Sequence, residues 1–224
     1  MIPLILARTQ SKRLPNKQLR LLSNKPMMDY VCLEAKKVFS EVFFSCDSED
    51  GGKINNHARE LGMTVIERPL LFTDDHTPAI QGIRYCTFKN PDFQDKDIML
   101  LNPCCPFITQ QDISNAMDLY THNRFDSLVS VVGSQEAHPS KVCTLAGGDT
   151  VSKEDLDIWQ TNHDNSVKTY RRNAAIYIFK ERNIWGNNTI FNGQIGVYVM
   201  SPEKSVDVNT EFDFKLAEFL QANQ

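Results

Sequence analysis

Six lysines and arginines fall within the first 28 residues of the chain, where aspartate and glutamate are absent. These residues are Arg8, Lys12, Arg13, Lys17, Arg20 and Lys25. The first carboxylate is Asp29, and the whole chain has a formal net charge of −4, so the acidic excess lies in the remainder. Basic side chains without neighbouring acids favour an anion such as a phosphate. A solvated surface loop is the alternative explanation of the same cluster.

Other polar residues follow apolar runs that predict strands, namely Asp47, Asn102 and Asp207. If these strands are parallel neighbours, their carboxyl ends and the basic segment 8–17 open onto one crevice. Basic groups on one wall and a carboxylate on another suit a nucleoside triphosphate with a divalent metal ion. The loop has neither GxxxxGK[ST] nor GxGxxG, so the sequence does not support a P-loop ATPase or a dinucleotide-dependent dehydrogenase.

The elements that must position these residues alternate along the chain. Residues 2–6 predict a buried first strand, whose carboxyl end carries the basic loop. Further strands are expected at residues 42–46, 64–66, 98–101, 127–132, 174–179 and 195–200. Helices are expected at residues 26–38, 53–61, 78–88, 109–120 and 210–220. This order predicts an α/β fold in which helices cover both faces of a parallel or mixed sheet.

Terminal residues support several of these helices. Pro26 is expected at a first helical position, and Thr109 with Asp112 resembles an N-terminal cap. Thr210 is expected to cap the last helix. The buried face of that helix is expected to consist of Phe212, Leu216, Phe219 and Leu220.

The length of 224 residues suits a single domain, residues 1–224. The pattern lapses at residues 133–168, which predicts a protruding arm, with a flexible loop as the alternative. No apolar run reaches eighteen residues and no signal-peptide pattern is present, so we expect a cytoplasmic protein without a membrane span. The six cysteines have no CxxC spacing, which argues against a zinc site or a disulfide framework.

The segment Leu6-Ala-Arg8-x-x-Ser11-Lys12-x-x-Pro15-x-Lys17 resembles the signature of cytidylyltransferases that activate nine-carbon 2-keto sugar acids. These are the CMP-sialic acid synthetases and their legionaminic and pseudaminic relatives. Residues 45–47, 68–69, 73–74, 138–141, 171–178 and 205–213 continue the resemblance in the same order. It implies a Rossmann-like nucleotidyltransferase sandwich with a mostly parallel sheet, flanking helices and a dimerisation arm.

The resemblance also implies a reaction and residue roles. The anomeric hydroxyl of the sugar acid would attack the α-phosphate of CTP in the presence of Mg²⁺, and pyrophosphate would leave. Arg8, Lys12 and Lys17 would be catalytic, and CTP would be held by Arg8, Ser11, Lys12, Lys17 and Asp74. The sugar acid would be held by Asn102, Lys141, Arg171 and Asn173. Asp207 and Asn209 would bind Mg²⁺. The protein would be a homodimer in which Lys141 contributes to the partner's site.

Four departures from the family pattern lie near this chemistry. Thr9-Gln10 stands where the family has Gly-Gly or Gln-Asn, and Gln18 stands where it has Asn. In residues 102–108 two hydroxyls are replaced by thiols and an arginine is lost, while Asn209 stands at the position of a second metal-binding Asp. These changes leave open an enzyme for another acidic sugar, such as a Kdo-like acid, or a weak or silent nucleotide-binding homologue.

Nucleic-acid binding is not expected from this sequence. The basic segment contains no aromatic residue before Tyr30, and the chain as a whole is acidic. Binding of single strands commonly relies on aromatic side chains on which bases stack, next to positive charge. The sequence therefore favours a small anionic ligand over a polymer.

Overall fold

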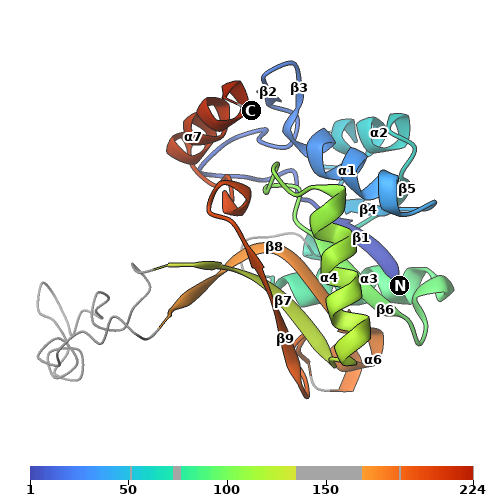
Figure 1. Ribbon diagram of the computed structural model, residues 1–224. Coiled ribbons are helices and arrows are strands. Elements are labelled where there is room, and N and C mark those ends of the chain that lie inside the picture. Colours follow the sequence, from blue (N-terminus) through green and yellow to red (C-terminus); the bar gives the residue numbers. More distant parts are fainter. Residues whose placement is uncertain (51, 73–76, 135–167, 187, 224) are drawn as a thin grey trace, which may run out of the picture.

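The computed structural model describes residues 1–50, 52–72, 77–134, 168–186 and 188–223. Its centre is a seven-stranded sheet with the order β5-β4-β1-β6-β8-β7-β9 (Figure 1). The strands are β1 (Ile2–Leu6), β4 (Phe43–Cys46), β5 (Thr64–Glu67), β6 (Asp97–Leu101), β7 (Ser127–Gly133), β8 (Tyr170–Lys180) and β9 (Ile195–Met200). Strand β8 runs antiparallel to β6 and β7, whereas the other neighbouring strands are parallel. The predicted mostly parallel sheet is therefore confirmed.

Helices cover both faces of the sheet. They are α1 (Met27–Val38), α2 (Lys53–Glu60), α3 (Ala79–Lys89), α4 (Gln110–Asn123), α6 (Glu181–Gly186) and α7 (Glu211–Ala222), with short 3₁₀ turns η1 (Leu70–Phe72), η2 (Pro91–Phe93) and η5 (Glu203–Ser205). One apolar cluster joins the sheet to α1, α2 and α4, and a second joins it to α3 and α6. The result is the three-layer sandwich that the alternation of strands and helices predicts.

A third apolar cluster lies under α7, beside the hairpin of β2 (Leu21–Leu22) and β3 (Lys25–Pro26). It includes Leu14 from the basic loop and Val208 from the segment before α7. Burial of these two side chains fixes both segments against the same part of the molecule, at the top of Figure 1. The basic loop is thus attached to the core in its middle as well as at its ends.

Two local expectations need correction. Pro26 pairs with Leu21 in the hairpin, and its extended backbone places it before the helix, which begins at Met27. The buried face of α7 is formed by Phe214 and Ala217, whereas Phe212 is 76% exposed. Leu216 and Phe219 are exposed as well, and Leu220 is partly buried. The capping boxes at Thr109 and Thr210 are confirmed.

The arm predicted at residues 133–168 lies mostly outside the described residues. At its base, the backbone N–H of Ser134 donates to the carbonyl of Thr169 at 3.0 Å, next to the ends of β7 and β8. The chain therefore leaves and re-enters the sheet at neighbouring points. Within the described part of the chain, no helix is long and apolar enough to cross a membrane.

Candidate active site

A cavity of about 270 Å³ opens at the carboxyl ends of the parallel strands. It brings together residues that lie far apart in the sequence. Its walls include Arg8, Lys17, Arg68, Asn102, Asp207 and Asn209. The basic loop, the end of β6 and the segment before α7 therefore meet in one crevice, as the sequence predicts. Asp47, which the sequence also placed in this crevice, is not in its wall and instead contacts Thr9 of the basic loop.

Lys17 and Asp207 are connected across this crevice through one amide. The Lys17 Nζ donates to the Asn209 Oδ1 at 3.2 Å and to the carbonyl of Val208 at 3.1 Å. The Asn209 Nδ2 donates to Asp207 Oδ2 at 2.8 Å, and Asn102 Nδ2 lies 3.4 Å from Asp207 Oδ1. Because Lys17 is only 8% exposed, its charge acts in a weakly screened setting.

The environment of Asp207 shifts its protonation equilibrium. Burial raises the pKa of this carboxyl, and the hydrogen bond from Asn209 and the charge of Lys17 oppose that shift only in part. The pKa therefore lies above its ordinary value. A bound cation would favour the ionised form, so the site is suited to receive positive charge.

The segment 207–209 is held by structure on both sides. The Val208 N–H donates to the carbonyl of Cys104 at 2.9 Å, which ties the segment to the loop after β6. The Asp213 carboxylate accepts from the backbone N–H groups of Asn209 at 3.0 Å and Thr210 at 2.7 Å. The capping box of α7 thus fixes the backbone that carries the crevice carboxylate.

Arg68 is a crevice residue to which the sequence analysis assigned no role. It is 4% exposed, and its guanidinium donates to the carbonyl of Ser45 at 3.0 Å and to the carbonyl of Ala7. Its Nε has no hydrogen-bond partner among the described residues. Burial lowers the pKa of Arg68, yet a guanidinium stays charged at neutral pH. The match of residues 68–69 to the family pattern was the signal that could have found it.

Two departures from the family pattern touch each other in the crevice wall. The Gln18 Nε2 lies 3.5 Å from the Cys104 Sγ, and both side chains are buried. The Gln18 Oε1 has no partner in the described part of the chain. Cys105 is in the core, where its Sγ lies 3.8 Å from the carbonyl of Asn173. Burial raises the pKa of both thiols, which keeps them neutral.

The remaining predicted site residues have different surroundings. Asn173 is 1% exposed, and its amide bonds to Ser130 Oγ at 2.6 Å and to Ser205 Oγ at 2.9 Å. The geometry thus favours a role in holding β8 and not direct contact with a sugar. Arg171 is exposed on β8. Lys12 is exposed and Ser11 is half-buried in the basic loop. Asp74 and Lys141 lie outside the described residues.

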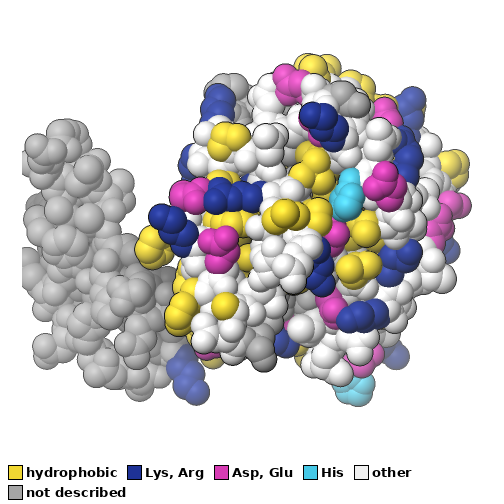
Figure 2. All heavy atoms as spheres, turned by 90° about the horizontal axis from the view of Figure 1, so that it is seen from above, with side chains coloured by type: hydrophobic (Ala, Val, Ile, Leu, Met, Phe, Trp, Pro, Cys, Tyr) yellow, Lys and Arg dark blue, Asp and Glu magenta, His cyan; other side chains and the backbone are white. Residues whose placement is uncertain are grey.

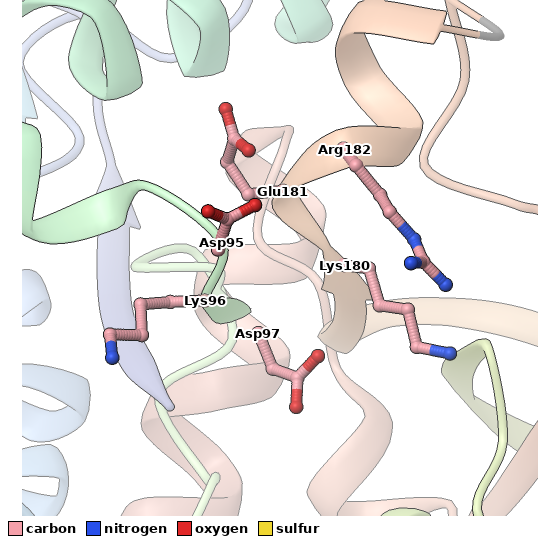
Figure 3. A pocket seen from close by; sticks show the side chains of 6 residues that line it. All are labelled: Asp95, Lys96, Asp97, Lys180, Glu181 and Arg182. Carbon is pink, nitrogen blue, oxygen red and sulfur yellow. The ribbon is translucent and has the colours of Figure 1, made fainter.

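A second pocket, of about 260 Å³, lies at the opposite end of β6 (Figure 3). It is lined by Asp95, Lys96, Asp97, Lys180, Glu181 and Arg182. Three acids balance three bases, and Figure 3 shows that the side chains spread in different directions. The pocket presents no excess charge to a ligand, so the crevice at the carboxyl ends is the better candidate site.

Seen from above, Lys and Arg side chains are interspersed with acidic and apolar side chains (Figure 2). No continuous basic stripe crosses the described residues on this face. A stripe of that kind is the electrostatic mark of a surface that follows a nucleic-acid backbone. The described residues on this face therefore lack that electrostatic mark.

A helix-covered, mostly parallel sheet with a basic loop after β1 and a facing carboxylate defines a nucleotidyltransferase-type sandwich. A family model described as Cytidylyltransferase matches residues 2–218. The chain belongs to this family, and the predicted resemblance to the CMP-sialic acid synthetases and the predicted CTP-dependent nucleotidyltransferase class are confirmed.

Three named relatives are similar to the chain over nearly its whole length. The chain is 27% identical to the post-translational flagellin modification protein B of Campylobacter coli, with 96% of this chain and 92% of the relative covered. It is 26% identical to the CMP-N,N'-diacetyllegionaminic acid synthase of Campylobacter jejuni, with 96% and 92% covered. An N-acylneuraminate cytidylyltransferase of Escherichia coli is 31% identical, with 98% and 52% covered, so the chain spans about half of that relative.

Solved structures support the fold. The structure of a CMP:2-keto-3-deoxy-manno-octonic acid synthetase complexed with CTP matches with a TM-score of 0.72 at 16% identity. The match covers 99% of this chain and 98% of the other. The predicted Rossmann-like nucleotidyltransferase sandwich is thereby confirmed.

Proposed function

We propose that the protein transfers the cytidylyl group of CTP to the anomeric hydroxyl of a nine-carbon 2-keto sugar acid of the sialic, legionaminic or pseudaminic type, releasing pyrophosphate. The observation that carries the proposal is the buried Lys17, linked through Asn209 to Asp207 in a crevice that also contains Arg8 and Arg68. Family membership and the names of the relatives supply the nucleotide and the acceptor class.

The chain's own residues would act by positioning and by charge neutralisation. In phosphoryl-type transfer the protein mainly aligns the reacting oxygens with the phosphorus and stabilises negative charge. Arg8, Ser11 and Lys12 would hold the triphosphate, and Lys17 would face its reacting end. The new bond forms between the sugar oxygen and the α-phosphorus, and the bond from that phosphorus to the pyrophosphate oxygen breaks. Asn102 and Arg171 would orient the sugar acid.

We propose Mg²⁺ as the metal ion, with Asp207 as its anionic ligand. Mg²⁺ is commonly held by one or two carboxylates together with substrate phosphates. Within the described residues there is no group of three or more His, Cys, Asp or Glu that could hold a metal ion, which fits a site completed by phosphates. The Asn209 Oδ1 faces Lys17, so its amide would have to turn to become a second ligand. When bound, Mg²⁺ would neutralise charge on the phosphates.

We also propose a cytoplasmic homodimer. Strand β9 lies at the edge of the sheet. One of its faces presents an exposed apolar strip that consists of Ile195, Val197 and Val199. Such a strip favours a protein partner. Asp74 for CTP and Lys141 in trans remain part of the proposal, together with the arm at 133–168. Light scattering during gel filtration would measure the predicted twofold mass.

The decisive experiment supplies CTP, ATP, GTP or UTP with Mg²⁺ and a panel of eight- and nine-carbon 2-keto acids, and measures pyrophosphate. Release with CTP and a nine-carbon acid is expected. A preference for an eight-carbon acid would indicate the Kdo-like alternative. Lys17→Gln should abolish release. Lys25→Gln removes another of the six basic charges in the first 28 residues but lies outside the crevice, so this variant should retain release.

A silent nucleotide-binding homologue is the second candidate. The replaced residues Gln18, Cys104 and Asn209 all line the crevice, which favours this alternative over a purely peripheral drift. CTP binding in calorimetry without pyrophosphate release from any acid would identify it. Release above the Lys17→Gln background would exclude it.

A further inference from the structure

The start of the basic loop is fastened to the end of β4 by one carboxylate. The Thr9 N–H donates to Asp47 Oδ2 at 3.1 Å, and the Thr9 hydroxyl donates to Asp47 Oδ1. The Glu49 N–H also donates to Asp47 Oδ1, at 3.1 Å. Asp47 is 1% exposed, although it is charged and lies between two loops. Three donors from the chain thus satisfy a buried anion, as such a group requires.

The carboxylate is itself held in place from behind. Asn55 of α2 donates to the backbone carbonyl of Asp47 at 3.1 Å and lies 3.1 Å from Ser48 Oγ. Burial raises the pKa of Asp47, but the hydrogen bonds from Thr9 and the neighbouring backbone outweigh it, and the pKa lies below its ordinary value. The carboxylate is therefore ionised at neutral pH and keeps its full strength as an acceptor.

Thr9 lies in the sequence between Arg8 and the pair Ser11 and Lys12, the three residues proposed to hold the triphosphate. The far end of the loop is fastened at Lys17, by its contacts with Val208 and Asn209. We propose that Asp47 is a positioning residue that orders the phosphate-binding loop through both the amide and the hydroxyl of Thr9. This inference rests on the proposed function for the identity of the bound anion, but the ordering of the loop is a property of the chain alone.

The hydroxyl contact is specific to a side chain with Oγ at position 9. The related family has Gly-Gly or Gln-Asn where this chain has Thr9-Gln10, so the hydroxyl contact belongs to this chain's own residues. Gln10 strengthens the same connection, because its Nε2 donates to Glu49 Oε1 at 2.9 Å. The loop, which lacks glycine, is thus held by side chains at the place where it must approach phosphate.

Electrostatics and positioning predict opposite effects of removing the Asp47 charge. A carboxylate next to a triphosphate site repels the ligand, so its neutralisation should strengthen CTP binding on Coulombic grounds alone. Asp47→Asn retains the shape but offers a single acceptor oxygen where Asp47 now accepts from three donors of Thr9 and Glu49. If Asp47 positions the loop, this substitution weakens CTP binding by about tenfold, which is the usual effect of losing one charged hydrogen bond.

Calorimetric titration with CTP compares wild type with Asp47→Asn, Thr9→Val, Thr9→Ser and the Asp47→Asn/Thr9→Val double variant. Glu60→Gln is the control, because it removes one exposed negative charge from α2, and its carboxylate contacts His57 Nδ1 at 3.5 Å and not the basic loop. We expect Thr9→Val to bind CTP several-fold more weakly and Thr9→Ser to resemble wild type. The double variant should bind CTP no more weakly than Asp47→Asn alone, because both substitutions act on the same contact between Thr9 and Asp47.

A second measurement needs no nucleotide. Arg13 is exposed within the loop, so its cleavage by trypsin reports loop order. Asp47→Asn and Thr9→Val should be cleaved several-fold faster than wild type, while Thr9→Ser and Glu60→Gln should match it. Tighter or unchanged CTP binding by Asp47→Asn would overturn the proposal, as would multiplicative effects in the double variant. If wild type binds no CTP, the proposed function fails, and equal trypsin rates would separately overturn the positioning role.

Discussion

Replacing Asn209 with Asp tests the proposed metal site where this chain departs from its family. The Asn209 amide donates to Asp207 Oδ2 at 2.8 Å and accepts from Lys17 at 3.2 Å. A carboxylate at position 209 removes the donor and places two negative charges side by side. Two like charges about 4 Å apart repel by about 4 kcal/mol at an effective dielectric constant of 20. We expect about 2 kcal/mol of destabilisation without metal, since Lys17 offsets part of this repulsion.

Addition of Mg²⁺ should reverse the sign of this effect. A second anionic oxygen strengthens the binding of a hard cation, so Asn209→Asp should reach half-maximal rate at a lower Mg²⁺ concentration than wild type. Urea unfolding in EDTA and in Mg²⁺ measures the same coupling without turnover. Asn209→Ala, which loses the bond to Asp207 and adds no charge, is the control. An unchanged or higher Mg²⁺ requirement would remove Asn209 from the metal site, and unaltered stability in EDTA would refute the assigned geometry.

Two further predictions concern the fold around the site. Ala174 has a φ of 61°, in the left-handed region, so Ala174→Gly should stabilise the protein by about 1 kcal/mol and raise its melting temperature by about 2–4 °C in calorimetry. Burial raises the pKa of Asp112, but Lys204 and Thr109 outweigh it and hold this pKa below its ordinary value. The stabilisation from Asp112 is therefore complete above about pH 4 and is lost as the pH falls through its folded pKa. Urea unfolding should show Asp112→Asn destabilised by about 2 kcal/mol at pH 7, with the deficit shrinking towards pH 3.

The strands of the sheet could be predicted because each is a short apolar run, bounded by residues that favour turns or helix caps. Direction could not be predicted, since β8 reads as a buried strand whether it runs parallel or antiparallel to its neighbours. The meeting of charged residues in the crevice was predictable from the order of the strands. Parallel strands bring their carboxyl ends to one edge, so Lys17 and Asp207 could be placed together from the order of elements alone.

The prediction of the buried face of α7 was wrong because the sequence of this helix satisfies helical periodicity in more than one way. Phe212, Leu216 and Phe219 form one apolar stripe, but Phe214 forms another with Ala217. The Arg20 guanidinium lies 3.9 Å from the centre of the Phe214 ring, and this tertiary contact accompanies the burial of the second stripe. Periodicity within one helix contains no information about such a distant partner.

Arg68 and Asn173 illustrate the same limit within the site. Arg68 was not assigned a role because its partners are main-chain carbonyls of two other strands' ends, which no local pattern specifies. Asn173 was expected to contact the sugar acid, but its amide is bonded to Ser130 and Ser205 inside the protein. An amide in a motif can serve the ligand or the scaffold, and only its burial and partners separate the two.

Two of the four departures from the family pattern contact each other, and the other two contact residues in or next to the site. Gln18 contacts Cys104, Asn209 contacts Lys17, and Thr9 contacts Asp47. Residues in direct contact do not contribute additively to stability or to binding. Replacing Gln18 with the family's shorter Asn would therefore leave the Cys104 sulfur without its donor. The departures should thus be tested as contacting pairs, because single reversions would confuse a lost local fit with a lost function.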